Sequence, residues 1–72
     1  MIKPLDLLNQ SLSGPVIVEL KSGRGYRGTL DGFDPHMNLV LKQVEETADG
    51  TATRKLELAI VRGDNVVYIS PP

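Results

Sequence analysis

Residues 26–33, Tyr-Arg-Gly-Thr-Leu-Asp-Gly-Phe, and the turn Asp-Pro-His at 34–36 decide the fold of this chain. Aromatic and apolar residues typical of a β-strand surround Gly28 and Gly32, which stand four residues apart on one face. Glycine inside a strand often marks a bulge or a tight bend. We therefore expect this segment to be a strongly curved strand.

The sequence on either side of this strand predicts one short helix and four further strands. A helix is expected at 4–12, because proline suits a first helical turn and the leucines recur at helical spacing. Alternating apolar and polar residues predict strands at 16–21, 37–44 and 54–61, and a short apolar run predicts a last strand at 66–69. In the strand at 54–61 we expect Leu56, Leu58 and Ile60 to face inward.

Residues 45–53 are polar and centred on Asp49-Gly50, a strong hairpin signal, so we expect a variable hairpin loop there. The predicted fold class is mainly β, with a short N-terminal helix followed by a strongly bent five-stranded antiparallel sheet. Such a sheet forms a small, partly open barrel of the SH3-like or OB-like kind. Its last strand, 66–69, carries no charge, and an uncharged apolar edge aggregates unless another chain covers it.

The chain has 72 residues, so we expect a single domain over 1–72. A domain of this size buries only about 60% of its unfolded surface and needs a further source of stability. The absence of cysteine excludes disulfides and thiolate metal sites. Oligomerisation is therefore the predicted source, by head-to-tail pairing of strands that can close into a ring.

Charge limits the kind of partner that the chain can bind. The formal net charge is −1, which argues against a broad basic surface and restricts any nucleic-acid contact to a local site. The sequence shows no apolar run near the roughly 20 residues needed to cross a bilayer, and no signal-peptide pattern at its start. The expected compartment is the cytoplasm.

Three other motifs are better explained by turn chemistry. Residues 23–28 match G-x-G-x-x-G, but strand and turn follow instead of a helix, so no dinucleotide cofactor is expected. The adhesion tripeptide at 62–64 has the composition of a tight turn. His36 is the single histidine, and Asp31 and Asp34 flank glycine-rich turns where aspartate is ordinary. We therefore expect no enzyme, no metal site and no cofactor.

Two turns between strands together contain the groups of a base-binding pocket. A base can stack between the ring of His36 and the planar guanidinium of Arg62. Asn38 carries both a donor and an acceptor, which match the O4 and N3–H edge of uracil. Asp64 can accept a hydrogen bond from Arg62 or Asn38, and Gly63 offers a backbone N–H. These five residues are the predicted RNA-binding site.

With these motifs in place, the sequence resembles the Sm/Lsm family, and most closely its archaeal members. The first Sm motif is matched by 15–44, most specifically at Gly28 and in Met-Asn-Leu-Val-Leu at 37–41. The second Sm motif is matched by 54–70, which contains Arg-Gly-Asp-Asn at 62–65. The combination of Met-Asn with Arg-Gly-Asp-Asn at this separation is more specific than either piece alone.

The resemblance implies the bent five-stranded Sm fold and a homo-oligomeric ring, usually of seven subunits in archaeal members. In similar proteins the fourth strand of one subunit pairs with the fifth of the next, and uridine lies near the central pore. The matching positions here are His36, Asn38, Arg62, Gly63 and Asp64. The Lys-His pair of the six-membered bacterial branch is absent from the second motif.

The predicted function is therefore non-enzymatic. The chain would form a ring that binds single-stranded, uridine-rich RNA, as a scaffold or chaperone in RNA processing or turnover, and RNA-processing proteins are possible further partners. The alternative is a structural ring module that mainly binds protein partners, which the acidic net charge favours slightly. The sequence leaves the biological RNA and the choice between seven and six subunits open.

Overall fold

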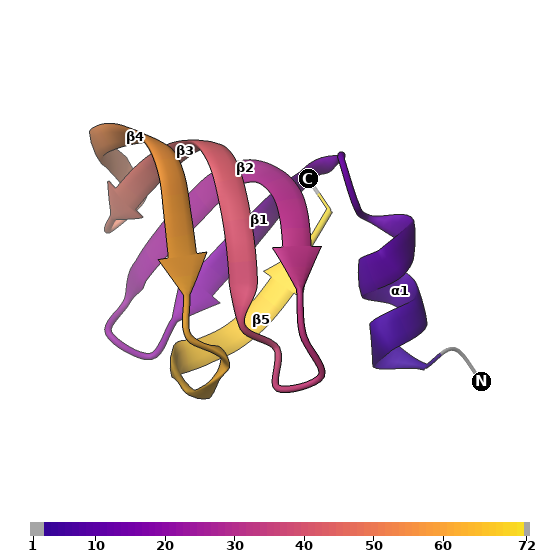
Figure 1. Ribbon diagram of the computed structural model, residues 1–72. Helices are drawn as coiled ribbons and strands as arrows, with labels where there is room; N and C mark the ends of the chain where they lie inside the picture. Colours follow the sequence, from indigo (N-terminus) through magenta and orange to yellow (C-terminus); the bar gives the residue numbers. More distant parts are fainter. Residues whose placement is uncertain (1–2, 72) are drawn as a thin grey trace.

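The computed structural model describes residues 3–71, which form a short helix beside a strongly bent antiparallel sheet (Figure 1). In chain order the elements are α1 (Pro4–Gln10), β1 (Pro15–Leu20), β2 (Arg24–Phe33), β3 (Leu39–Ala48), β4 (Thr51–Val61), the 3-10 turn η1 (Gly63–Asn65) and β5 (Val66–Ser70). The five strands are hydrogen-bonded in the order β4-β3-β2-β1-β5. The predicted fold class is confirmed.

The bend of β2 depends on a close approach of β3 at one glycine. The pairing register of the two strands shifts across Gly28 and again between Leu30 and Gly32. A Cβ atom on Gly28 would lie 2.9 Å from the backbone oxygen of Lys42, closer than side chains tolerate. A Cβ atom on Gly32 would meet nothing nearer than 4.0 Å. Both glycines therefore lie in the curved strand, but only Gly28 is required by space.

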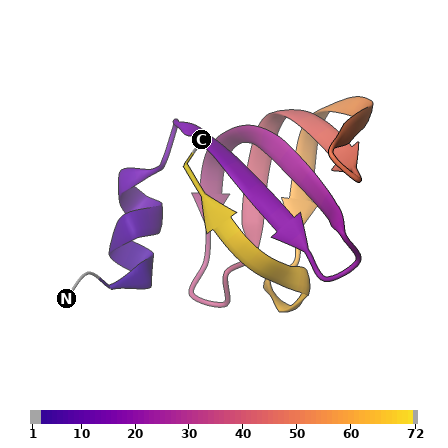
Figure 2. The same ribbon diagram turned by 180° about the vertical axis from the view of Figure 1, so that it is seen from behind.

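The hydrophobic core lies inside the curve of the sheet and is small. Its buried side chains come from α1 and from all strands but β5, and they are Leu8, Val16, Val18, Leu30, Leu39, Leu41, Val44 and Val61. α1 contributes only Leu8. Seen from behind, β1 and β5 lie side by side, and α1 stands apart at one side of the barrel (Figure 2).

The helix is shorter than the predicted 4–12 and ends at Gln10. The chain leaves the helix because the next backbone groups pair with β2. The N–H of Ser13 donates to the oxygen of Leu30 at 2.7 Å, and the N–H of Leu30 donates to the oxygen of Gly14 at 3.0 Å. No helix among residues 3–71 has the length and apolar character that crossing a membrane would require.

The third and fourth strands are longer around the hairpin than the sequence indicated. The segment 45–53, expected as a loop, is mostly strand, because Asp49 and Gly50 alone make the turn with φ angles of 53° and 77°. Positive φ at both central positions matches the twist of the flanking strands. At its other end β3 begins at Leu39 instead of the predicted 37, since Met37 has left-handed backbone geometry with φ 66°.

The predicted inward face of β4 was wrong at two positions. Leu58 is 55% exposed and Ile60 is 72% exposed, whereas Val61 is buried. Val61 and Ala59 pair with the buried residues of β3 and therefore share their inner face. Leu58 and Ile60 lie on the outer face of β4, which is an edge strand of the sheet. Leu56, the third predicted residue, packs against the core.

The two glycines of β2 provide a matched test of the bend. Gly28→Ala should lower the free energy of unfolding by about 1–3 kcal/mol, because the new methyl group meets the backbone of Lys42. Gly32→Ala should be neutral or slightly stabilising, since it has space and reduces the backbone freedom of the unfolded chain. Urea unfolding at one protein concentration measures both. Equal losses for the two variants would contradict the assigned role of Gly28.

Candidate functional site

The turn between β2 and β3 is organised by the carboxylate of Asp34. Its Oδ1 accepts hydrogen bonds from the backbone N–H groups of His36 at 2.9 Å and Asn38 at 3.0 Å. Its Oδ2 accepts from the side-chain amide of Asn38 at 2.9 Å. The backbone of Asp34 also pairs with Met37 and Asn38. This network fixes the position of the His36 backbone and the direction of the Asn38 side chain.

The side chain of Asn38 joins this turn to the turn between β4 and β5. Its Oδ1 accepts a 2.8 Å hydrogen bond from the backbone N–H of Gly63, which is 25 residues further along the chain. A Cβ atom on Gly63 would overlap the backbone oxygen of His36 and lie 2.8 Å from the carbonyl carbon of Met37. Only glycine therefore allows the two turns to approach this closely.

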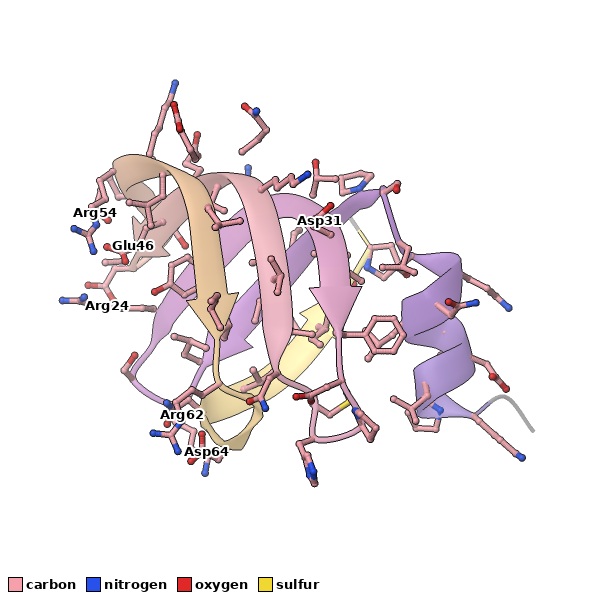
Figure 3. The ribbon with its side chains drawn as sticks, viewed as in Figure 1. Arg24, Asp31, Glu46, Arg54, Arg62 and Asp64 are labelled. Atoms are coloured by element: carbon pink, nitrogen blue, oxygen red, sulfur yellow. The ribbon has the colours of Figure 1, made fainter. Side chains whose placement is uncertain are left out.

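Arg62 and Asp64 flank this contact at the same end of the barrel (Figure 3). Nη2 of Arg62 lies 3.3 Å from Oδ2 of Asp64, and both side chains are exposed. An exposed pair of this kind adds little stability. Its effect here is local, because it restricts the guanidinium plane to the neighbourhood of the turn.

The structure brings all five predicted site residues together. His36, Asn38, Arg62, Gly63 and Asp64 line an open hollow of about 480 Å³, together with Met37. A neighbouring hollow, on the outer face of β2 to β4, shares Asn38 and Arg62 with it. Among residues 3–71, no three His, Cys, Asp or Glu side chains gather as the ligands of a metal ion would.

Sequence reasoning missed the part played by Asp34. Asp31 and Asp34 do not form a carboxylate pair. Asp31 forms an ion pair with Lys42 at 3.1 Å, and Asp34 accepts hydrogen bonds within its own turn. The available signal was the spacing Asp-x-His-x-Asn, in which an aspartate can accept hydrogen bonds from the backbone two and four residues on. The hydrogen bond from the Asn38 side chain, with help from the backbone and against desolvation, holds the pKa of Asp34 below its usual 3.8.

A second polar cluster lies at the far end of the sheet and is separate from this hollow (Figure 3). Glu46 is buried there, with Arg54 at 3.4 Å and the hydroxyl of Thr53 donating to it at 3.3 Å. Burial would raise the pKa of Glu46, but Arg54 and the hydrogen bonds from Tyr26 and Thr53 outweigh it, and the net pKa is lowered. The cluster therefore provides an ion pair and a hydrogen bond for the buried carboxylate of Glu46 near the hairpin.

Comparison with known proteins shows that nearly the whole described chain is similar to one family of proteins. A family model described as LSM domain matches residues 6–71. An Sm-like protein of Archaeoglobus fulgidus is 58% identical over 69 residues, which cover 96% of this chain and 90% of that protein. An Sm-like protein of Methanococcoides burtonii is 55% identical over 69 residues, covering 96% of each.

Solved structures give the same result for the fold. The Pyrococcus abyssii Sm protein in complex with a uridine heptamer has a TM-score of 0.95 and 42% identity, and the match covers 99% of this chain and 100% of that one. The P. aerophilum SmAP1 heptamer has a TM-score of 0.91 and 38% identity, with 100% and 96% covered.

The lowered pKa of Asp34 gives a pH prediction with a definite sign. Its carboxylate is favoured in the folded state, so its contribution to stability should be complete above pH 3.8 and lost as the pH falls through the lower folded value. Carboxyl-carbon NMR should give a midpoint for Asp34 below 3.8. The stability difference between the wild type and Asp34→Asn should shrink only below that pH. A midpoint at or above 3.8 would contradict the network.

Proposed function

The chain belongs to the LSM domain family, and from this premise we propose that it forms a ring that binds single-stranded, uridine-rich RNA. The observation that carries the proposal is the hydrogen bond from Gly63 to Asn38, where the proposed Sm motifs 15–44 and 54–70 of one domain meet. Its cellular role would be that of a non-enzymatic scaffold or chaperone in RNA processing or turnover in the cytoplasm. The complex of the Pyrococcus relative with a uridine heptamer supports the choice of ligand.

The pocket supplies separate groups for the face and the edge of a base. The ring of His36 and the guanidinium of Arg62 provide two planes for stacking, and Asp64 holds Arg62 by an ion pair. Asn38 presents its amide to the edge of the base, and Gly63 fixes that amide from behind. The positive charge of Arg62 gives the acidic chain one local attraction for phosphate.

The two edges of the sheet support ring formation. β4 and β5 are the edge strands, and both carry exposed apolar side chains, which are Leu58, Ile60, Val67 and Tyr68. When β4 of one subunit pairs with β5 of the next, side chains on the outer face of one strand continue on the outer face of the other. Exposed apolar side chains of the two strands would then lie next to one another across the joint and lose part of their exposure to water. The heptamers among the relatives favour seven subunits.

The alternative is a structural ring that mainly binds protein partners. An apolar groove of about 300 Å³ between α1 and β5, lined among others by Leu7 and Tyr68, favours it together with the net charge of −1. Oligo-uridine binding separates the two functions, because a purely structural ring would not discriminate between uridine and adenosine.

Substitution at the sheet edge tests assembly. Val67→Lys should break the ring or unfold the subunit, because a charge is placed in an apolar strand joint and the core alone is small. Leu5→Lys is the control, since Leu5 is an exposed apolar residue that belongs to α1 and to neither edge strand. Light scattering should give a multiple of 7.8 kDa for the wild type and the control. A folded wild-type monomer at low micromolar concentration would contradict the ring.

Two substitutions separate base choice from base stacking. Asn38→Ala should remove the preference for oligo-uridine, a loss of about 1–3 kcal/mol of discrimination for one base edge. Arg62→Ala should weaken binding of all sequences, by about 1–3 kcal/mol for each stacked base. Fluorescence titration with uridine, cytidine and adenosine oligomers of one length, at one salt concentration, measures both. If Asn38→Ala keeps the wild-type ranking and spacing, the site assignment is wrong.

A further inference from the structure

The amide of Asn38 is held at both ends by groups of opposite hydrogen-bonding character. Its Nδ2 donates to the carboxylate of Asp34 at 2.9 Å, and its Oδ1 accepts from the backbone N–H of Gly63 at 2.8 Å. A carboxylate only accepts, and a backbone N–H only donates. The two neighbours therefore permit a single orientation of the amide.

Rotating the amide by half a turn would replace both hydrogen bonds by repulsive contacts. Oδ1 would face the carboxylate oxygen of Asp34, and Nδ2 would face the N–H of Gly63. Neither neighbour can move away easily. Asp34 also accepts from the backbone of His36, and Gly63 lies against the His36–Met37 backbone. The orientation is thus set by the fold before any ligand arrives.

Because the Asn38 amide has one orientation, it presents its donor and its acceptor to a base in one fixed order. The amide has two hydrogens and two oxygen lone pairs, and the two neighbours use one of each. The remaining N–H and lone pair match the adjacent O4 acceptor and N3–H donor of uracil. Cytosine presents a donor at position 4 and an acceptor at N3, which is the reverse order, and a rotated amide would suit it equally well.

We propose that Asp34 is a specificity-determining positioning residue, which makes the pocket reject cytosine by fixing the direction of the Asn38 amide. The inference rests on the proposed RNA-binding function and deepens it. Asp34 acts through Asn38 and needs no contact with the RNA. Its carboxylate is suited to this because it is ionised at neutral pH and can only accept, so Nδ2 of Asn38 must face it.

Asp34→Asn tests the proposal, because asparagine keeps the size of Asp34 and adds a donor. The introduced amide can still accept from the backbone of His36 and Asn38, but its N–H₂ then faces the amide of Asn38 and the single orientation is lost. Competition binding at fixed salt should show the ratio of oligo-uridine to oligo-cytidine affinity falling by roughly fivefold to tenfold, the lower part of the range for one base-edge contact. Asp31→Asn is the control, since it removes the same charge from the neighbouring pair with Lys42.

The side-chain amide signals of Asn38 in the RNA-free protein give a second measurement. Slow solvent exchange and one signal set are expected for the wild type and for Asp31→Asn, and faster exchange or two sets for Asp34→Asn. Asp34→Asn retaining the wild-type affinity ratio while still binding RNA would overturn the proposal and leave RNA binding intact. Wild-type protein that binds oligo-uridine and oligo-cytidine equally would do the same. No binding of any oligomer by the wild type would overturn the proposed function as well.

A double variant covers the case in which Asp34→Asn does not fold. Asp34→Asn combined with Asn38→Asp restores the net charge and both hydrogen bonds. The introduced asparagine donates to the introduced aspartate, and that aspartate still accepts from Gly63. The double variant should fold like the wild type and lose the preference for uridine, since a carboxylate repels O4. If it also fails to fold, the turn requires a carboxylate at position 34 in order to fold, so the role of Asp34 is structural and the proposal is wrong.

Discussion

The hydrogen bond between the Gly63 N–H and the Asn38 side chain connects two turns that are 25 residues apart in the chain. It forms only if the strands that lead into these turns end at the same place. β3 and β4 are paired so that Leu39, the residue after Asn38, lies opposite Val61, two residues before Gly63. The approach also requires glycine at position 63, because any side chain would meet the backbone of the β2–β3 turn. The pairing register of β3 and β4 therefore determines the geometry of the pocket that the two turns form.

The bend of the sheet is the second condition, and it leaves two edges unpaired. Gly28 lets β3 approach β2 closely, and the sheet curls around a core of few side chains without closing on itself. A sheet that remains open must protect its edges, and this one carries apolar residues on both. The same curvature that forms the core therefore leaves the joint through which copies of the chain would meet.

The order of the elements could be predicted from the sequence because it depends on local patterns, and the members of the pocket could be predicted because the two turns that carry them match the two Sm motifs. Turn residues mark 34–36 and 62–65, and alternation marks the strands between them. The inward face of β4 could not be predicted, since Leu58 and Ile60 are as apolar as a core residue and only pairing with β3 shows which face is inside. The part played by Asp34 was also hidden. An aspartate before a proline has a sufficient local explanation, and its bond to the Asn38 side chain is visible only in three dimensions.

The proposed pocket would also let a chain with a net charge of −1 hold a polyanion. The charge of Arg62 is partly neutralised by Asp64. One subunit therefore offers a plane for stacking and hydrogen-bonding groups for the edge of a base, and little electrostatic attraction for phosphate. A single pocket of that kind binds weakly. When identical subunits repeat it around a ring, a single strand of RNA that occupies one pocket raises the effective concentration of its next nucleotide at the neighbouring pocket. Repetition would then supply the affinity, and the fixed edge of Asn38 would supply the selectivity at every step, so an RNA of one repeated base would gain most from the arrangement.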